Sequence, residues 1–437
     1  MARSEGRAGW AGAVFLALYS TLWRVAAPVL PLLLPRLRPG WTHRLGWCFR
    51  PGPADIWIQA ASGGEAYLAL EILEAFMPGT EFRVLLTTCT AQGEEILVRG
   101  LEGKSWEGRV QIRFFPFDVP GISLGLIRGA GIDLMILLET EIWPGLLEAC
   151  RRAGVQIWVV NGRMTEKSRR GYVRLGGLLA GRGPSRVLAV SEADGARFQS
   201  VFPDALVERM SNIKFDRAAV PLVPDRDGPS WTAEGNGLFV FGSLRREEEH
   251  LILPVFPELA RRHPQVIPAI FPRHMERVES WEKALIAADL PVCRLSRMEA
   301  PCPPGTILLG DVFGRLGQAY TRASWAFVGG SLAPCGGQNF LEPLACGVRP
   351  VIGPHWKNFA WVGQEIIDLG LVLQIGSAAD LVRVPDLNPE ARELILKRAG
   401  DFMAARRGGA AQAAREILGF FDRIAGGRDT ISGPKTL

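Results

Sequence analysis

The glycine-rich stretch at residues 329–343, GGSLAPCGGQNFLEP, restricts the fold of this chain more than any other feature. It follows the apolar run 325–328 and precedes a run with helical spacing. This order predicts a strand, a loop whose backbone a ligand can approach, and a helix start. Doubly wound domains bind nucleotides this way, so we expect loop N–H groups to face a phosphate and Asn339 and Glu342 to accept from ribose hydroxyls. A glycine-rich turn without a ligand has the same pattern.

Mainly apolar runs recur along the rest of the chain, with helix-like stretches such as 66–76 and 145–153 between them. Parallel strands that helices cover on both faces have this pattern. In the first half we predict strands at Ile56–Ala60, Val84–Thr87, Arg113–Phe117, Leu134–Leu138, Ile157–Val160 and Val187–Val190. In the second half we predict them at Leu238–Phe241, Val266–Phe271, Thr306–Leu309, Trp325–Val328 and Arg349–Ile352.

The predicted fold class is α/β, with two Rossmann-like domains that face a cleft. A chain of 437 residues is long enough for two or three domains. Between the two sets of strands the composition shifts to Pro, Asp and Gly, which indicates a linker. We predict an N-terminal segment at 1–45, a first domain at 46–217, a linker at 218–237, a second domain at 238–425 and a flexible tail at 426–437.

The N-terminal segment is both apolar and basic. From residue 8 to 34 the only charge is Arg24, and residues 1–50 contain seven arginines against Glu5. The chain has a net charge of +5, so the remainder carries about −1. This distribution favours a membrane surface over nucleic acid as the partner. We expect a tilted span or an interfacial helix with its arginines on the cytoplasmic side, rather than a signal peptide, and a buried hydrophobic helix is the alternative.

The seven cysteines have no Cys-x-x-Cys spacing, and several lie in apolar surroundings. Their odd number and scatter predict reduced thiols in a cytosolic compartment and no zinc site. With 48% hydrophobic and 22% charged residues, the chain is globular, which excludes the disordered class.

Three acidic residues follow predicted strands in the first half. Ser62-Gly63-Gly64-Glu65 opens a helix, and its spacing is that of a capping box, in which Glu65 bonds the backbone of Ser62. The two glycines also leave room for a substrate hydroxyl, for which Glu65 is a candidate base. Glu139 and Glu141 follow a buried strand, where doubly wound sheets place ligand groups, although acids at a helix start give the same pattern.

Cations follow predicted strands in the second half. Ser243 and Arg245 come after one strand, and Arg273 and His274 come after another. Cations clustered with helix N-termini suit a phosphate leaving group without a metal ion. A single arginine is more often a surface charge, but three strand ends agree here, namely these two and the one before the glycine-rich loop.

Nine motifs in order resemble those of the 3-deoxy-D-manno-octulosonate (Kdo) transferases of lipopolysaccharide synthesis. The resemblance covers roughly residues 20–425, and ordered agreement of this kind is far more specific than any one motif. The motifs are SGGE (62–65), TTCTAQG (87–93), FPFD (115–118), ETEIWP (139–144), NGRMTEKS (161–168), KFD (214–216), PRHMER (272–277), GGS (329–331) and GGQNFLE (336–342).

The resemblance implies an inverting glycosyltransferase of the GT-B type, which takes Kdo from CMP-Kdo and attaches it to a lipid A precursor at the cytoplasmic face of the inner membrane. It places the general base on Glu65, and the motif with Glu139 and Glu141 is also required in the family. The chain differs from the usual family pattern at Gly63, at Leu244-Arg245 and at Gln338, where the family usually has histidine.

The chemistry of the donor gives the remaining assignments. CMP leaves as an anion and Kdo carries a carboxylate, so we assign Arg273, His274 and Arg245, with the Gly336–Gly337 loop, to the phosphate. Asn339 and Glu342 are assigned to the ribose, and Lys214 to an anionic group of donor or acceptor. We expect no metal ion or other cofactor. Two alternatives remain, a GT-B transferase that uses another nucleotide sugar and a non-catalytic, membrane-attached glycolipid-binding protein.

Overall fold

The computed structural model describes residues 51–217 except 180, residues 230–431, and residues 19, 21–23, 25 and 44. The chain forms two compact units, one of residues 1–217 with 406–437 and one of residues 218–405. The predicted N-terminal segment lies almost entirely outside the described residues, as do residues 218–229 of the predicted linker and 432–437 of the predicted tail.

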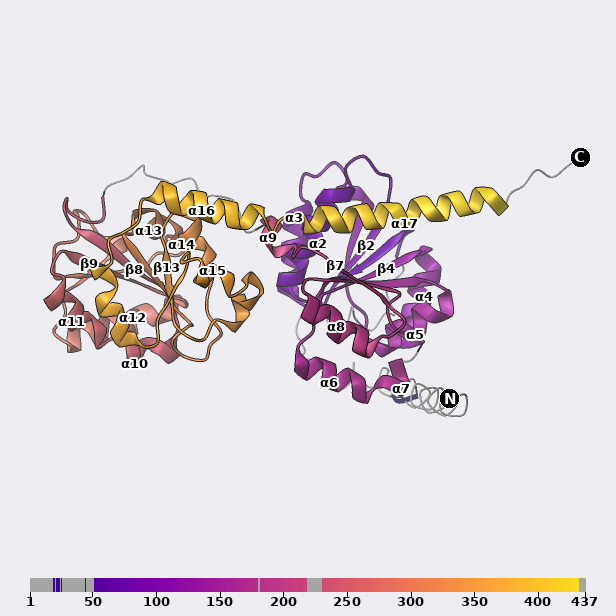
Figure 1. The fold of residues 1–437 in the computed structure, drawn as a ribbon, viewed down its shortest axis with the longest axis horizontal. Helices are drawn as coiled ribbons and strands as arrows, with labels where there is room; N and C mark the ends of the chain where they lie inside the picture. Colours follow the sequence, from indigo (N-terminus) through magenta and orange to yellow (C-terminus); the bar gives the residue numbers. More distant parts are fainter. Residues whose placement is uncertain are drawn as a thin grey trace, which may run out of the picture. The chain divides into compact units, whose positions relative to one another are not determined.

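The first unit is built on a parallel sheet, which has seven strands among the described residues (Figure 1). Their order is β3-β2-β1-β4-β5-β6-β7, so the first strand lies inside the sheet, between the second and the fourth. The strands are β1 (Ile56–Gln59), β2 (Val84–Thr88), β3 (Val110–Phe114), β4 (Leu134–Leu138), β5 (Gln156–Gly162), β6 (Arg186–Ala189) and β7 (Leu206–Arg209).

Helices connect these strands in sequence order. Side chains of Ser62, Thr90, Thr165 and Ser191 cap four of them by accepting from backbone N–H groups of the first turn. The helices are α2 (Gly63–Phe76), α3 (Ala91–Leu101), α4 (Pro120–Ala130), α5 (Pro144–Ala153), α6 (Glu166–Arg174), α7 (Gly176–Leu179), α8 (Glu192–Val201), α9 (Lys214–Arg217) and α17 (Gly409–Ile431).

Helix α17 belongs to the first unit, which corrects the prediction that residues up to 425 complete the second domain. It packs on α2 (Figure 1). Phe420 lies edge-on to Trp158 with 5.4 Å between ring centroids, and Phe421 lies 4.5 Å from Phe82. Because burial of these aromatic rings is favourable, the helix packs on the first unit even though it follows the second unit in the sequence. The helix also reaches Ile431, so the predicted flexible tail is shorter than 426–437.

The second unit repeats the architecture, with seven parallel strands among its described residues. Their order is β10-β11-β9-β8-β12-β13-β14, so its first strand β8 lies between β9 and β12. The strands are β8 (Gly237–Leu244), β9 (Val266–Pro272), β10 (Val292–Arg294), β11 (Ile307–Leu309), β12 (Trp325–Val328), β13 (Pro350–Ile352) and β14 (Leu373–Gln374). The helices are α10 (Glu249–Ile252), α11 (Val255–Arg262), α12 (Val278–Ala287), α13 (Leu316–Arg322), α14 (Leu341–Ala345), α15 (Glu365–Asp368) and α16 (Arg392–Ala404).

The prediction of two Rossmann-like domains is confirmed, while three strands were missed. The missed strands β7, β10 and β14 are short and partly exposed, so they lack a continuous apolar run. Strand β3 begins three residues earlier than predicted. The prediction included the apolar Phe115, but this residue packs in the core from the loop beyond the strand. No helix in the described part of the chain has both the length and the apolar character to cross a membrane.

Candidate active site

Both sheets bring predicted site residues to their topological switch points, except for Lys214, which follows β7 at the edge of the first sheet. Strand order reverses around β1 in the first unit and around β8 in the second, and doubly wound sheets bind ligands outside the carboxyl ends of the strands at such points. The residues at the ends of β1 and β4 are Glu65, Glu139 and Glu141. Those at or beyond the ends of β8, β9 and β12 are Ser243, Arg245, Arg273, His274, Gly336, Gly337, Asn339 and Glu342.

Glu65 forms the capping box that the sequence predicts. The N–H of Ser62 donates to Oε2 of Glu65 at 2.7 Å, and the N–H of Glu65 donates to Oγ of Ser62 at 3.4 Å. The side chain is buried, with 7% of the residue exposed. The cap accounts for the position of this carboxylate at the first turn of α2.

The surroundings of Glu65 also suit a base. Burial, the largest cause, acts together with the charges of Glu141 and Glu139 to raise its pKa from 4.5 to about 7, against the lowering effect of the hydrogen bonds with Ser62. A carboxylate with a pKa near 7 can take a proton at neutral pH far better than one with an ordinary pKa. The capping and catalytic interpretations are therefore compatible.

Glu139 follows β4 and has a left-handed backbone with φ of 55°. Its Oε1 lies 2.6 Å from Nζ of Lys214 and 3.7 Å from Nη1 of Arg163. Positive φ is uncommon outside glycine and is often retained at functional sites. The structure thus brings Lys214 beside Glu139, although 75 residues separate them.

Glu141 has a different environment from Glu139. Its Oε2 accepts a 2.7 Å hydrogen bond from Nε1 of Trp143, and burial raises its pKa. The charge of Glu141 also raises the pKa of Glu65 more than the charge of Glu139 does. Glu139 is therefore the ion-paired member of this motif, and Glu141 is the member that acts most on Glu65.

Asp118 holds the loop that carries Glu141, a role that the sequence did not suggest. Its carboxylate accepts hydrogen bonds of 2.7 Å from the N–H groups of Gly145 and Leu146, at the start of α5. The hydroxyl of Tyr19 donates to the same carboxylate at 2.9 Å. Asp118 therefore links the FPFD motif to the first turn of α5.

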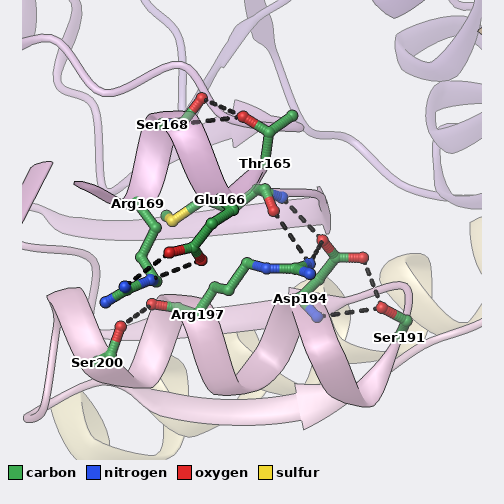
Figure 2. A network of polar contacts seen from close by, with 9 residues as sticks. Thr165, Glu166, Ser168, Arg169, Ser191, Asp194, Arg197 and Ser200 are labelled. Carbon is green, nitrogen blue, oxygen red and sulfur yellow. Dashed lines mark hydrogen bonds and ion pairs between the residues drawn. The ribbon is translucent and has the colours of Figure 1, made fainter. Parts of the chain in front are cut away.

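The NGRMTEKS motif is held by α8. Figure 2 shows Thr165 capping α6 by accepting from the N–H of Ser168 at 3.1 Å, while Asp194 of α8 accepts from the N–H of Met164 at 2.9 Å. Arg197 donates to the carbonyl of Met164 at 3.2 Å. These contacts fix the chain next to Arg163, whose guanidinium faces Glu139.

In the second unit, Glu248 occupies the glycine-rich loop. This carboxylate is fully buried and accepts from the N–H groups of Gly330, Ser331 (2.9 Å) and Leu332 (2.7 Å). The prediction that these N–H groups face a phosphate is therefore wrong, because a buried carboxylate needs donors and takes them from the loop. In the sequence Glu248 lies in the charged run RREEE, which is typical of a solvated surface.

The rest of the glycine loop is also bonded internally. The N–H of Gly337 donates to the carbonyl of Gly330 at 2.6 Å, and that of Gln338 donates to the carbonyl of Gly329 at 3.0 Å. Gly330, Gly336 and Gly337 have φ values of 71°, 89° and 81°, which explains why glycine is needed there. The loop is thus preformed by hydrogen bonds within the protein.

Asn339 and Glu342, which the sequence analysis assigns to the ribose, lie together. Nδ2 of Asn339 donates to Oε1 of Glu342 at 2.9 Å. Burial raises the pKa of Glu342, while Asn339 and the charge of Arg273 lower it. Arg273 therefore acts on the same carboxylate from the end of β9, which is separated from β12 by β8.

Two further predicted residues lie close to this loop. Ser243 is left-handed, with φ of 54°, and a Cβ on Gly329 would lie 2.6 Å from its carbonyl oxygen, so the ends of β8 and β12 approach closely. Nε of Arg245 lies 3.6 Å from Oε2 of Glu247. His274 is exposed, just beyond β9.

The described part of the chain has six free cysteines and no cluster of three His, Cys, Asp or Glu side chains that could hold a metal ion. The expected metal independence remains a prediction.

Comparisons with known proteins agree on one family. The family model of the 3-deoxy-D-manno-octulosonic-acid transferases (Kdo transferases) matches residues 39–217. The 3-deoxy-D-manno-octulosonic acid transferase of Bordetella pertussis is 32% identical over 335 residues, which cover 75% of this chain and 78% of that protein. The enzyme of the same description from Haemophilus influenzae is 27% identical over 427 residues, or 92% of this chain and 97% of that protein.

Solved structures show the similarity in fold. The crystal structure of a glycosyltransferase from Rickettsia africae covers 86% of this chain and 99% of its own chain with a TM-score of 0.53. The sequence identity is 13%, so this likeness concerns the fold alone.

Proposed function

This chain belongs to the Kdo transferase family, and from that premise we propose that it transfers Kdo from CMP-Kdo to a lipid A precursor with inversion and without a metal ion. The observation that carries the proposal is Glu65, a buried carboxylate with a pKa of about 7 at the switch point of the first sheet. The family supplies the reaction, and Glu65 supplies a group that can start it.

Glu65 is the general base of the proposed reaction. Its carboxylate takes the proton from an acceptor hydroxyl as that oxygen attacks the anomeric carbon of Kdo. The bond from the anomeric carbon to the phosphate oxygen breaks, and its electrons leave with CMP. Glu141 keeps the pKa of Glu65 high, while Glu139 holds Lys214 in the same cluster.

The second unit is proposed to bind the donor. Arg245, Arg273 and His274 stabilise the phosphate charge of CMP, and the preformed loop with Gly336 and Gly337 shapes the site. Asn339 and Glu342 accept from the ribose hydroxyls. Because Glu248 occupies the N–H groups of residues 330–332, phosphate recognition falls on the cations and not on those amides.

The proposed location is the cytoplasmic face of the inner membrane. Support comes from the apolar, arginine-rich N-terminal segment of the sequence. A chain that begins at Trp47 should be more soluble and keep part of its activity on a detergent-dispersed acceptor. Full-length protein found wholly in the soluble fraction at low salt contradicts this location.

The decisive experiment is product analysis by mass spectrometry after incubation with CMP-Kdo and a tetraacylated lipid A precursor. We expect the acceptor to gain the mass of one or more Kdo residues, in the presence of EDTA as in its absence. Parallel reactions with UDP-sugars test the alternative donor class. Transfer from a UDP-sugar, or no transfer from any donor, overturns the proposal.

A further inference from the structure

Asn161 occupies an unusual position at the end of β5. Its φ is 57°, and the pairing of β5 with β6 shifts register between Val159 and Gly162, so Asn161 lies in a bulge. The preceding residue, Val160, accepts from the N–H of Glu139 at 3.1 Å. Two left-handed residues, Glu139 and Asn161, therefore end adjacent strands.

The side chain of Asn161 is fully buried and makes one long-range hydrogen bond. Oδ1 accepts from the N–H of Ile213 at 2.9 Å, while Nδ2 is unpaired among the described residues. An unpaired buried donor is unfavourable, and so is a left-handed backbone at a residue other than glycine, although asparagine tolerates it better than most. Glycine would avoid both costs, so what asparagine provides at this position is the acceptor for the N–H of Ile213.

That acceptor organises the turn before α9. Ile213 directly precedes Lys214, whose own N–H donates to Oδ1 of Asn212 at 3.1 Å. The two asparagine carboxamides therefore fix two consecutive N–H groups, that of Ile213 and that of Lys214 itself. Nζ of Lys214 then lies 2.6 Å from Oε1 of Glu139.

We propose that Asn161 is a positioning residue for the transfer reaction, which sets Lys214 against Glu139 by binding the N–H of Ile213. This inference rests on the proposed function. Without the carboxamide, the Asn212–Lys214 turn loses one of its two side-chain acceptors. The ammonium group of Lys214 is then no longer held in one position. Charged groups that act on Glu139 or lie close to it include Glu65 from α2, Glu141 from the loop after β4 and Arg163 after β5.

Selective labelling of Lys214 tests the positioning without any substrate. Asn161→Gly keeps the left-handed backbone and removes the acceptor. We expect acylation of Lys214, followed by peptide mass spectrometry and normalised to Lys397, to become severalfold faster than in the wild type. Asp289→Gly is the matched control, because Asp289 is also left-handed, with φ of 58°, but lies on an exposed loop of the second unit.

Kinetics test whether the position matters for transfer. We expect Asn161→Gly to lower kcat/KM by about 10-fold, within the 10²-fold that a misplaced group can cost. In a Lys214→Met background the same change should have a factor close to 1, because its target is gone. Asn161→Asp retains an acceptor and tolerates positive φ, so its Lys214 labelling should stay closer to the wild type than that of Asn161→Gly.

Three results overturn the inference: unchanged Lys214 labelling in Asn161→Gly, equal labelling in the Gly and Asp variants, or effects of Asn161→Gly and Lys214→Met that multiply. If Asn161→Gly does not fold, the comparison of Asn161→Asp with the wild type decides, and a labelling rate well above the wild type then counts against the inference. Wild-type protein that transfers no Kdo disproves the proposed function but leaves the labelling result readable.

Discussion

The N–H of Ser62 lies 2.7 Å from Oε2 of Glu65, so the carboxylate that we propose as the base is also half of a helix cap. One residue thus has a structural and a chemical role, and only substitutions that separate the two can measure each.

Glu65→Gln should abolish most of the transfer. The amide can still accept from Ser62 but cannot take a proton, so we expect turnover to fall on the order of 10²-fold or more, with donor affinity close to normal. Ser62→Ala is the control, because it breaks the cap and keeps the carboxylate. It should cost about 1 kcal/mol of stability and leave most of the turnover. Near wild-type turnover of Glu65→Gln moves the base to Glu139 or Glu141.

The pH profile of kcat/KM should report the raised pKa of Glu65. The base must be ionised, so activity should rise with pH through about 7. Glu141→Gln removes a negative neighbour, which lowers the pKa of Glu65 and moves the acidic limb to lower pH. An acidic limb that stays in place in this variant contradicts the electrostatic link between the two carboxylates.

Glu248→Gln should weaken CMP binding and lower the melting temperature. An amide nitrogen in place of one carboxylate oxygen faces N–H groups instead of accepting from them, and an unmatched buried donor costs about 1–3 kcal/mol. Calorimetric titration with CMP and thermal unfolding provide the two readouts. Glu258→Gln, an exposed change on α11 of the same unit, should alter neither. Normal CMP affinity with a lowered melting temperature limits Glu248 to a structural role.

Glu342→Ala should act on donor binding more than on stability. The side chain is half-buried and its contact with Asn339 lies within one turn, so we expect weaker CMP binding and little change in the melting temperature of the unliganded protein. Titration of both proteins with CMP measures the difference. Unchanged affinity removes Glu342 from the ribose site.

The local features of the site could be predicted from the sequence. Ser62 and Glu65 are three residues apart, and their cap depends on the first turn of one helix. The same holds for Asn339 and Glu342, and for apolar strands such as β4, where burial on both faces leaves a continuous run. Interactions within one turn or one strand depend on residues that are close in sequence, so the residue pattern predicts them.

The long-range partners of polar and charged side chains could not be predicted in this way. Glu248 accepts from N–H groups that lie 82 to 84 residues further along the sequence. Lys214 is separated from Glu139 by 75 residues, and Ile213 from Asn161 by 52 residues. The return of α17 to the first unit is of the same kind.

By itself, the sequence determined two doubly wound domains, the strand ends where the candidate site residues lie and the family to which the motifs belong. Tertiary structure alone decided that Glu248 fills the glycine loop, that Lys214 lies against Glu139 and that the last helix packs on the first unit. The physical reason is that a buried carboxylate takes whichever donors the fold brings to it, and an aromatic helix face packs wherever an apolar surface is left uncovered. Neither the partner of the carboxylate nor the packing surface of the helix can be predicted from the residues adjacent to it in the sequence.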